Sequence, residues 1–428
     1  MSPSTETAAP RAAAPPSFAA LRHPGYRAYF FGSALAMMAD SIEHVISYWM
    51  MFQKFHSPAL GGFAVLSHWL PFLFFSVYSG ALADRFDPRR LIQIGMLLFM
   101  LVSFCWGVLF LSDSLEMWQA MALLTIHGFA GVFWGPPSQL LIHDIVGPAQ
   151  LQSAIRLNAT SRYLGLLMGP AIGGAILLLL GPAYGILLNV IIYLPLVLWL
   201  WKAPYGPRFR KQPAPPRRAA RGFADILATL REIATNKTLI AMTVLAGGYS
   251  LIIGNAYQAQ MPEFAHDLGH GDAGLLYSML LGADAAGALT AGLVLESRGL
   301  LQARPRTAFI LAILWCFAIG GFAASPTYPL ALILLFAAGF LELSFNAMAQ
   351  TLVQIHAPVA IRGRVIGVYS MFAQGLRAFS GVTVGIAGSL IGIHWSLALS
   401  AGALLTIIST LLALAMRRAP AGAVSTAD

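Results

Sequence analysis

Three ionisable residues stand close together near the start of the chain, Asp40, Glu43 and His44. Their spacing places them on one face if the segment is helical. Two carboxylates and an imidazole so close together alter one another's affinity for protons, because like charges repel and opposite charges attract. We hypothesise that Asp40 or Glu43 exchanges a proton and that His44 tunes this exchange. The alternative is a permanently paired cluster that only supports the fold.

Five further ionisable residues lie deep inside apolar runs of the sequence. A charge at the centre of a bilayer costs about 2.5–3.5 kcal/mol on insertion scales, so these side chains should face protein or a wet cavity. Asp284 and Glu342 are further candidates for proton coupling. Arg162 and Arg377 either neutralise these acids or hold an anionic group of a substrate, and His127 is a candidate for substrate contact.

A membrane-spanning scaffold must position these residues, because 58% of the 428 residues are hydrophobic and only 10% are charged. Soluble domains carry about 25% charged residues, and a helix needs about 20 apolar residues to cross a bilayer. The runs lack the alternation typical of membrane strands, which favours helices. Twelve spans are expected at 28–53, 61–83, 90–112, 117–141, 152–180, 184–202, 238–262, 272–296, 306–324, 327–352, 364–392 and 395–416.

The net charge of +9 is unevenly placed along the chain. Arginine and lysine gather in the two tails and in the loops after even-numbered spans, whereas Lys54 is alone among the other loops. The positive-inside rule then predicts that both termini are cytoplasmic, in an inner (plasma) membrane protein. This placement indicates topology rather than nucleic-acid binding, and contact with anionic membrane lipids is a secondary possibility. The first residues have no apolar core and do not resemble a signal peptide.

The chain divides into two similar halves. The stretch Lys202–Lys237 is rich in Pro and Arg and ends in an expected amphipathic helix over Phe223–Ile233. At an offset of 211, Gly128 matches Gly339, and at 215, Arg162 matches Arg377. An ordered series of such matches indicates a parallel repeat of six helices, with a site at the repeat interface. We expect a cytoplasmic tail, a six-helix bundle, a cytoplasmic linker, a second bundle and a tail at 1–26, 27–202, 203–237, 238–417 and 418–428.

The loop Gly80–Arg90, GALADRFDPRR, resembles the loop between helices 2 and 3 of the major facilitator superfamily. Its matching residues are Gly80, Leu82, Ala83, Asp84, Arg85, Arg89 and Arg90. The resemblance implies an ion-pair latch that faces a helix N-terminus across the interface and holds the outward-open state; the alternative is that these charges only set topology. The repeat-related segment keeps Glu296 and Arg298 but loses the paired arginines, so we expect an asymmetric gate.

A second motif combines small residues with a proline in the fifth span: Gly165, Gly169, Pro170, Gly173 and Gly174. It resembles the superfamily motif of exporters and antiporters. Small residues at this spacing allow close helix packing, and proline favours a bend. Together with LRHPGYRAYFFG before the first span, the chain looks most similar to the branch that holds enterobactin-type siderophore exporters and macrolide efflux proteins.

Other polar and aromatic residues deep in the spans are candidates for substrate contact, although such residues often bridge helices or anchor at the interface instead. They are Tyr48, Trp134, Gln139, Asn158, Tyr257, Asn346 and Gln350. No metal site is expected, because the pair His266 and His270 in an outer loop is a weak signal on its own. Cys105 and Cys316 are expected to be buried, inert thiols, and no ATP-binding or hydrolase motif is present in the sequence.

The sequence thus predicts an all-α membrane protein of twelve helices in two parallel six-helix repeats. We expect a monomeric, proton-coupled exporter of a small amphipathic compound, by resemblance a drug-like molecule or a siderophore, with the proton gradient in place of any cofactor. An importer or a lysophospholipid carrier is the nearest alternative. A membrane-embedded enzyme would need a catalytic constellation that the sequence lacks, and a transport-dead sensor would need a soluble effector domain.

Overall fold

The computed structural model describes residues 18–55, 58–209, 223–268, 275–298, 300–380, 384 and 387–417, and these residues are almost entirely helical. The N-terminal half consists of α1 (Pro24–Phe55), α2 (Pro58–Arg85), α3 (Pro88–Leu111) and α4 (Met117–Lys202). Gly147 and Gly181 break α4, with φ angles of 68° and 74° that favour glycine. The element therefore supplies three spans, 117–146, 148–180 and 182–202.

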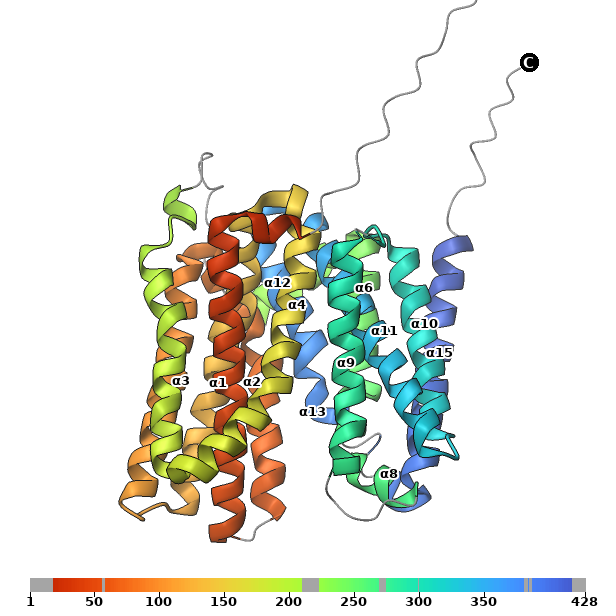
Figure 1. Ribbon diagram of the computed structural model, residues 1–428. Helices are drawn as coiled ribbons and strands as arrows, with labels where there is room; N and C mark the ends of the chain where they lie inside the picture. The colour runs from red at the N-terminus through yellow and green to blue at the C-terminus, as the bar shows by residue number, and fades with distance from the viewer. Residues whose placement is uncertain are drawn as a thin grey trace, which may run out of the picture.

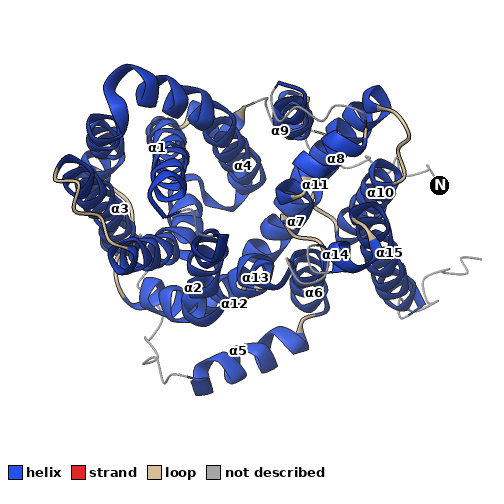
Figure 2. Cartoon of the chain, turned by 90° about the horizontal axis from the view of Figure 1, so that it is seen from below, coloured by secondary structure: helices blue, strands red, loops and turns tan. Residues whose placement is uncertain are grey.

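The C-terminal half follows the linker helix α5 (Phe223–Thr235). It consists of α6 (Lys237–Ile252), α7 (Ala256–Ala259), α8 (Met261–Asp267), α9 (Leu275–Ser297), α10 (Pro305–Ala323), α11 (Tyr328–His356), α12 (Arg362–Ser370), α13 (Arg377–Ser380), α14 (Ala387–Ile391) and α15 (Ile393–Arg417). In Figure 1 the two halves stand side by side, and α15 ends on the side of the bundle where α1 begins. Seen from below in Figure 2, α5 lies along the outside of the bundle, and its Ile233 packs into the core of the C-terminal half.

The expected spans correspond to these helices, with two interruptions that the sequence did not predict. The seventh span breaks after α6, where Gly254 has a φ of 47°. The eleventh span contains a π-helical segment, Met371–Gly375, between α12 and α13. Both breaks border the space between the halves, and π-helical segments are frequent at functional sites.

Eight helices in the described part of the chain are long and apolar enough to cross a membrane by length and composition. The expected spans that this criterion omits are the first, fourth, fifth and eleventh. They carry Asp40, His127, Arg162 and Arg377, respectively, and the eleventh is also broken into short helices. The eighth and tenth spans meet the criterion although they carry Asp284 and Glu342.

Candidate functional site: a polar cavity between the halves

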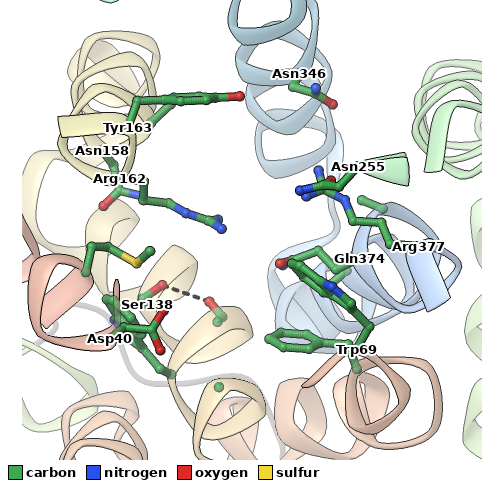
Figure 3. Close-up of a pocket in the computed structure, with 18 of the residues that line it drawn as sticks. Asp40, Trp69, Ser138, Asn158, Arg162, Tyr163, Asn255, Asn346, Gln374 and Arg377 are labelled. Carbon is green, nitrogen blue, oxygen red and sulfur yellow. Dashed lines mark hydrogen bonds between the residues drawn. The ribbon is translucent and has the colours of Figure 1, made fainter. Parts of the chain in front are cut away.

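A cavity of ≈ 440 Å³ lies between the two halves. Residues of α1, α2, α4, α11 and the interrupted seventh and eleventh spans line it, and Figure 3 shows them converging on a common space. The lining includes these residues singled out from the sequence: Asp40, His44, Tyr48, Trp134, Gln139, Asn158, Arg162, Glu342, Asn346, Gln350 and Arg377. Side chains separated by up to several hundred positions thus share one site.

The two repeat-related arginines face each other across this cavity (Figure 3). Within the described residues, Arg162 makes no hydrogen bond or ion pair with protein. The Arg377 guanidinium lies over the rings of Trp69 and Tyr249, with its central carbon 5.2 and 5.8 Å from the ring centroids, and its buried Nε has no hydrogen-bond partner. Neither arginine forms an ion pair with an acid in the described part of the chain, so two positive charges face the cavity.

The acids of the C-terminal half bind tyrosines instead of arginines. The Tyr249 hydroxyl donates to Glu342 at 2.6 Å, and Tyr163 lies 3.3 Å from the same oxygen. The Tyr257 hydroxyl is 3.2 Å from the other Glu342 oxygen and 3.3 Å from both oxygens of Asp284. A hydroxyl has one proton to donate. Tyr257 can therefore donate to only one of the two carboxylates, and the Gln258 amide donates to Asp284 at 3.1 Å. Both acids are buried and neither forms an ion pair within the described residues, so a proton shared between them would remove an uncompensated charge.

The acids of α1 lie against a cluster of histidines. His127 Nδ1 is 2.8 Å from Glu43, and His127 Nε2 is 3.0 Å from Asp40. Glu43 also accepts a hydrogen bond from Ser103. His44 Nδ1 lies 2.7 Å from the backbone carbonyl of Asp40. Proton exchange by Asp40 or Glu43 stays a prediction, and the doubly bonded Glu43 also fits the alternative of a structural pair.

Four of the sequence candidates do not line the cavity. His127 is held between Asp40 and Glu43, while Tyr257 is completely buried beneath the acids that it binds. Neither residue lines the cavity in this conformation, and direct substrate contact by them stays a prediction. Glu43 and Asp284 are also buried behind the wall, 2% and 3% exposed, because their partners draw them into the helix bundles.

Contacts between the halves seal the cavity towards the end of the bundle where α1 begins. Gln354 donates to Gln139 at 3.2 Å across the interface, and His143 lies 3.0 Å from Arg362. Next to them α2 packs on α12 almost backbone to backbone. A Cβ atom added to Gly80 would stand 2.0 Å from the carbonyl oxygen of Gly363.

Asp84 holds the first turn of α12 at this seam. Its two carboxylate oxygens accept from the backbone N–H groups of Gly363 at 2.7 Å and Arg364 at 3.0 Å. These are unsatisfied donors at the positive end of a helix, where a carboxylate is favourable. The contact of the loop acid with a helix N-terminus across the interface is the geometry that the loop resemblance implied.

The basic residues of the loop do not form the expected ion pair with Asp84. Arg85 and Arg90 are exposed, and their cations lie over the rings of Phe86 and Trp201. Arg89 pairs with Asp87, which also caps α3 by accepting from the Arg89 backbone N–H at 3.0 Å. Asp87 and Pro88 are not among the residues that match the superfamily loop. Asp87 thus supplies a helix cap and a partner for Arg89, and Pro88 occupies the first turn, where its missing N–H is harmless.

We expect Gly80→Ala to open this seam, because the added methyl group has no space before the Gly363 carbonyl. Overpacking of this kind typically costs about 1–3 kcal/mol, which would shift the conformational equilibrium by roughly 5- to 150-fold. Accessibility labelling of single cysteines in α2 and α12 measures the shift. Gly402→Ala is the matched control, since nothing lies within 4 Å of a Cβ atom there; equal labelling of both variants would contradict the expectation.

The repeat-related seam joins α9 to the 148–180 segment of α4. Glu296 accepts from the hydroxyl of Ser153, and a Cβ atom at Gly292 would be 1.8 Å from Thr160 Oγ1. The Arg156 guanidinium donates across the seam to the carbonyl groups of Leu295, Leu300 and Leu301. Arg298 is exposed and forms no ion pair within the described residues. Glu296 therefore contributes a smaller share of the contacts at this seam than Asp84 does at the other, because Arg156 forms a separate set of hydrogen bonds here.

Asp84→Asn should therefore bias the conformational equilibrium more than Glu296→Gln. Asparagine keeps only one acceptor oxygen and no charge at the α12 N-terminus, a loss of about 0.3–1 kcal/mol, or roughly two- to fivefold. Cysteine accessibility on both sides of the membrane gives the comparison. If the two variants change labelling equally, Asp84 is a topology charge and not a latch.

The small-residue motif of the fifth span packs against α1. Cβ atoms at Gly165 and Gly169 would stand 2.7 Å from Met37 Cβ and 2.2 Å from Ser41 Cβ, whereas nothing lies within 4 Å at Gly174. Gly173 approaches Ile42 at 3.3 Å, and the side chain of Pro170 lies outside the described residues. The glycines thus fix the segment of α1 that carries Asp40, and the motif's link to antiport stays a prediction.

Several residues of the site were missed in the sequence. Arg156, Tyr163 and Tyr249 were not singled out from the sequence. The position of Tyr163 and Tyr249 deep in spans of a chain that also carries buried acids was the signal that could have found these two, since a buried hydroxyl requires a partner.

Two six-helix repeats around a polar cavity define a secondary transporter of the major facilitator superfamily, and not an enzyme. The chain belongs to the family described as transmembrane secretion effector, whose family model matches residues 15–427. Among curated relatives, the enterobactin exporter EntS of Shigella boydii serotype 4 is 27% identical over 358 residues, which cover 81% of each chain.

Solved structures share the fold. The human organic anion transporter MFSD10 (TETRAN) superposes with a TM-score of 0.73 at 15% identity, over 90% of this chain and 98% of the other. The major facilitator superfamily proton:xylose symporter XylE gives 0.70 at 16% identity, over 92% and 95%. At these identities the likeness concerns the fold alone.

Proposed function

We propose that this transporter exports a small amphipathic organic compound with an anionic group, in exchange for protons. The observation that carries the proposal is the pair Arg162 and Arg377, which face the cavity and form no ion pair with any residue that the structure describes. Ionisable residues deep in a membrane protein usually pair with an opposite charge, and an anionic substrate would supply that partner here. The secretion family and the relatives named enterobactin exporters support export and make a siderophore the first compound to test.

The exchanged proton is assigned to the pair Glu342 and Asp284. Glu342 lines the cavity, so hydrogen-bond donors of the substrate can compete with a proton for its carboxylate. Tyr249 connects the two sites, because its ring lies under the Arg377 guanidinium while its hydroxyl binds Glu342. Competition for one carboxylate gives exchange, since proton and substrate then bind in alternation.

Alternating access would rock residues 27–202 against 238–417. If both termini are cytoplasmic, as the charge distribution predicts, the sealed end is the cytoplasmic one and this conformation faces outward. Opening requires Gly363 and Arg364 to leave Asp84. The same proposal describes a monomer in the inner membrane, in contact with lipids, with no cofactor besides the proton gradient and no nucleic-acid partner.

Reconstituted proteoliposomes test this function. A panel that pairs each anionic siderophore or drug-like compound with its neutral ester is offered in counterflow, then with an imposed pH gradient. We expect exchange of the anionic member, and accumulation driven by the gradient in the direction of antiport. Uptake in the direction of proton flow would indicate an importer. Absence of flux for every compound would contradict the proposal and favour the alternative of a transport-dead sensor.

A further inference from the structure

We propose that His44, His68 and His127, together with Asp40, form a binding site for a divalent transition-metal ion of the Zn²⁺ class. The histidines come from three different spans: α1, α2 and the 117–146 segment of α4. One ring nitrogen of each lies within 4.8 Å of the others. Sequence spacing could not reveal this cluster, because each helix contributes a single histidine.

The second ring nitrogen of two histidines is already held in the way that metal ligands require. His127 Nδ1 faces the Glu43 carboxylate at 2.8 Å, and His44 Nδ1 faces the Asp40 carbonyl oxygen at 2.7 Å. Metal-binding histidines usually donate their remaining N–H to a carboxylate or a backbone carbonyl. Ser103 in turn donates to Glu43, which fixes its orientation.

Two ring nitrogens are available as ligands. His68 Nδ1 is buried and has no hydrogen-bond partner within the described residues. His127 Nε2 belongs to a side chain that is only 4% exposed, and it faces the Asp40 carboxylate. The Asp40 carboxylate is 3.0 Å from His127 Nε2 and completes a set of three nitrogens and one oxygen. Imidazole and carboxylate ligands suit Zn²⁺ and its neighbours. Bonds of about 2.0–2.1 Å place tetrahedral ligands roughly 3.4 Å apart, so the rings must approach by roughly 1 Å.

The site opens to the transport cavity, because Asp40, His44 and His68 line its wall while His127 lies behind them. A bound ion could exchange the carboxylate for a donor atom from the cavity, as ions with an open position do. The arginines Arg162 and Arg377 face the same space. A metal ion at this site would thus face the space in which an anionic, metal-chelating compound could bind. Metal binding itself does not depend on the proposed function.

Titration of tag-free protein in detergent tests the site. We expect one Zn²⁺ per chain by calorimetry, and visible absorption typical of four-coordinate Co²⁺ when Co²⁺ replaces it. His68→Ala and His127→Ala should abolish both signals, and Glu43→Gln should weaken binding about 10- to 100-fold, as loss of an outer partner does. His356→Ala, an exposed histidine at the end of α11, should change nothing.

Thermal unfolding of the unaltered protein gives a measurement that needs no variant. Zn²⁺ should raise the unfolding temperature, because a ligand that binds only the folded state stabilises it. Lack of saturable binding to the unaltered protein, or binding that survives in both histidine variants, would overturn the proposal. Because no transported compound is present, failure here leaves the export proposal intact, and failure of transport leaves the metal site intact.

Discussion

Glu342→Gln should abolish the response of transport to a pH gradient while leaving counterflow intact. The carboxylate lies in a wall of the cavity, bound by Tyr249 and Tyr163 and linked to Asp284 through Tyr257. A glutamine keeps the size and a carbonyl acceptor but cannot take up a proton. If one proton is exchanged per substrate, a gradient of one pH unit drives about tenfold accumulation, and the variant should show none.

Accumulation in proteoliposomes with the membrane potential clamped measures this loss, and Asp284→Asn should share it. Glu263→Gln is the control, because Glu263 is an exposed acid in α8. Gradient-driven accumulation that survives in both acid variants would move the coupling role to the acids of α1, where Asp40→Asn and Glu43→Gln are the next substitutions to measure.

The second large effect is expected at the arginine pair. Arg162→Ala and Arg377→Ala should each weaken binding of the anionic substrate, because a hydrogen bond to a charged group contributes about 1.5–3 kcal/mol, or roughly 10- to 150-fold in affinity. Arg162→Lys should retain part of the affinity, since the charge is kept but the planar guanidinium is lost.

Binding assays on folded, monodisperse protein measure this effect, with the neutral ester of each compound as a second ligand. Arg304→Ala, in an exposed loop, is the matched control. We expect the ester to bind all variants alike. Unchanged affinity of both alanine variants for every active compound would exclude a substrate role and leave the arginines as structural charges.

Much of the architecture was predictable because it depends on one-dimensional properties. A run of apolar residues must be long enough to cross a bilayer, and a loop such as Gly80–Arg90 cannot be buried in it. The interruptions at Gly254 and at Met371–Gly375 were not predictable. Hydropathy does not distinguish a continuous helix from a broken one, and the breaks are stabilised by neighbours from other spans.

The candidate site was predicted in its members but not in its pairings. The free-energy cost of a charge in lipid predicted that four residues face inward, and the structure places all four on one cavity: Asp40, Glu342, Arg162 and Arg377. The hydrogen-bond partners of two acids differ from the arginines that charge alone suggested. Glu342 binds tyrosines, and Asp84 binds backbone N–H groups of α12 in place of an arginine of its own loop.

The sequence by itself determined the class of protein, the two repeats and the ionisable residues that must avoid lipid, because length, hydropathy and charge position act locally. Only the tertiary structure decided which of these residues meet. Their partners depend on the rotation and depth of each helix, which close contacts such as Gly80 on Gly363 and Gly169 on Ser41 establish. These contacts join residues far apart in the chain, so two arginines came to lie free across a cavity and three single histidines came to share one centre.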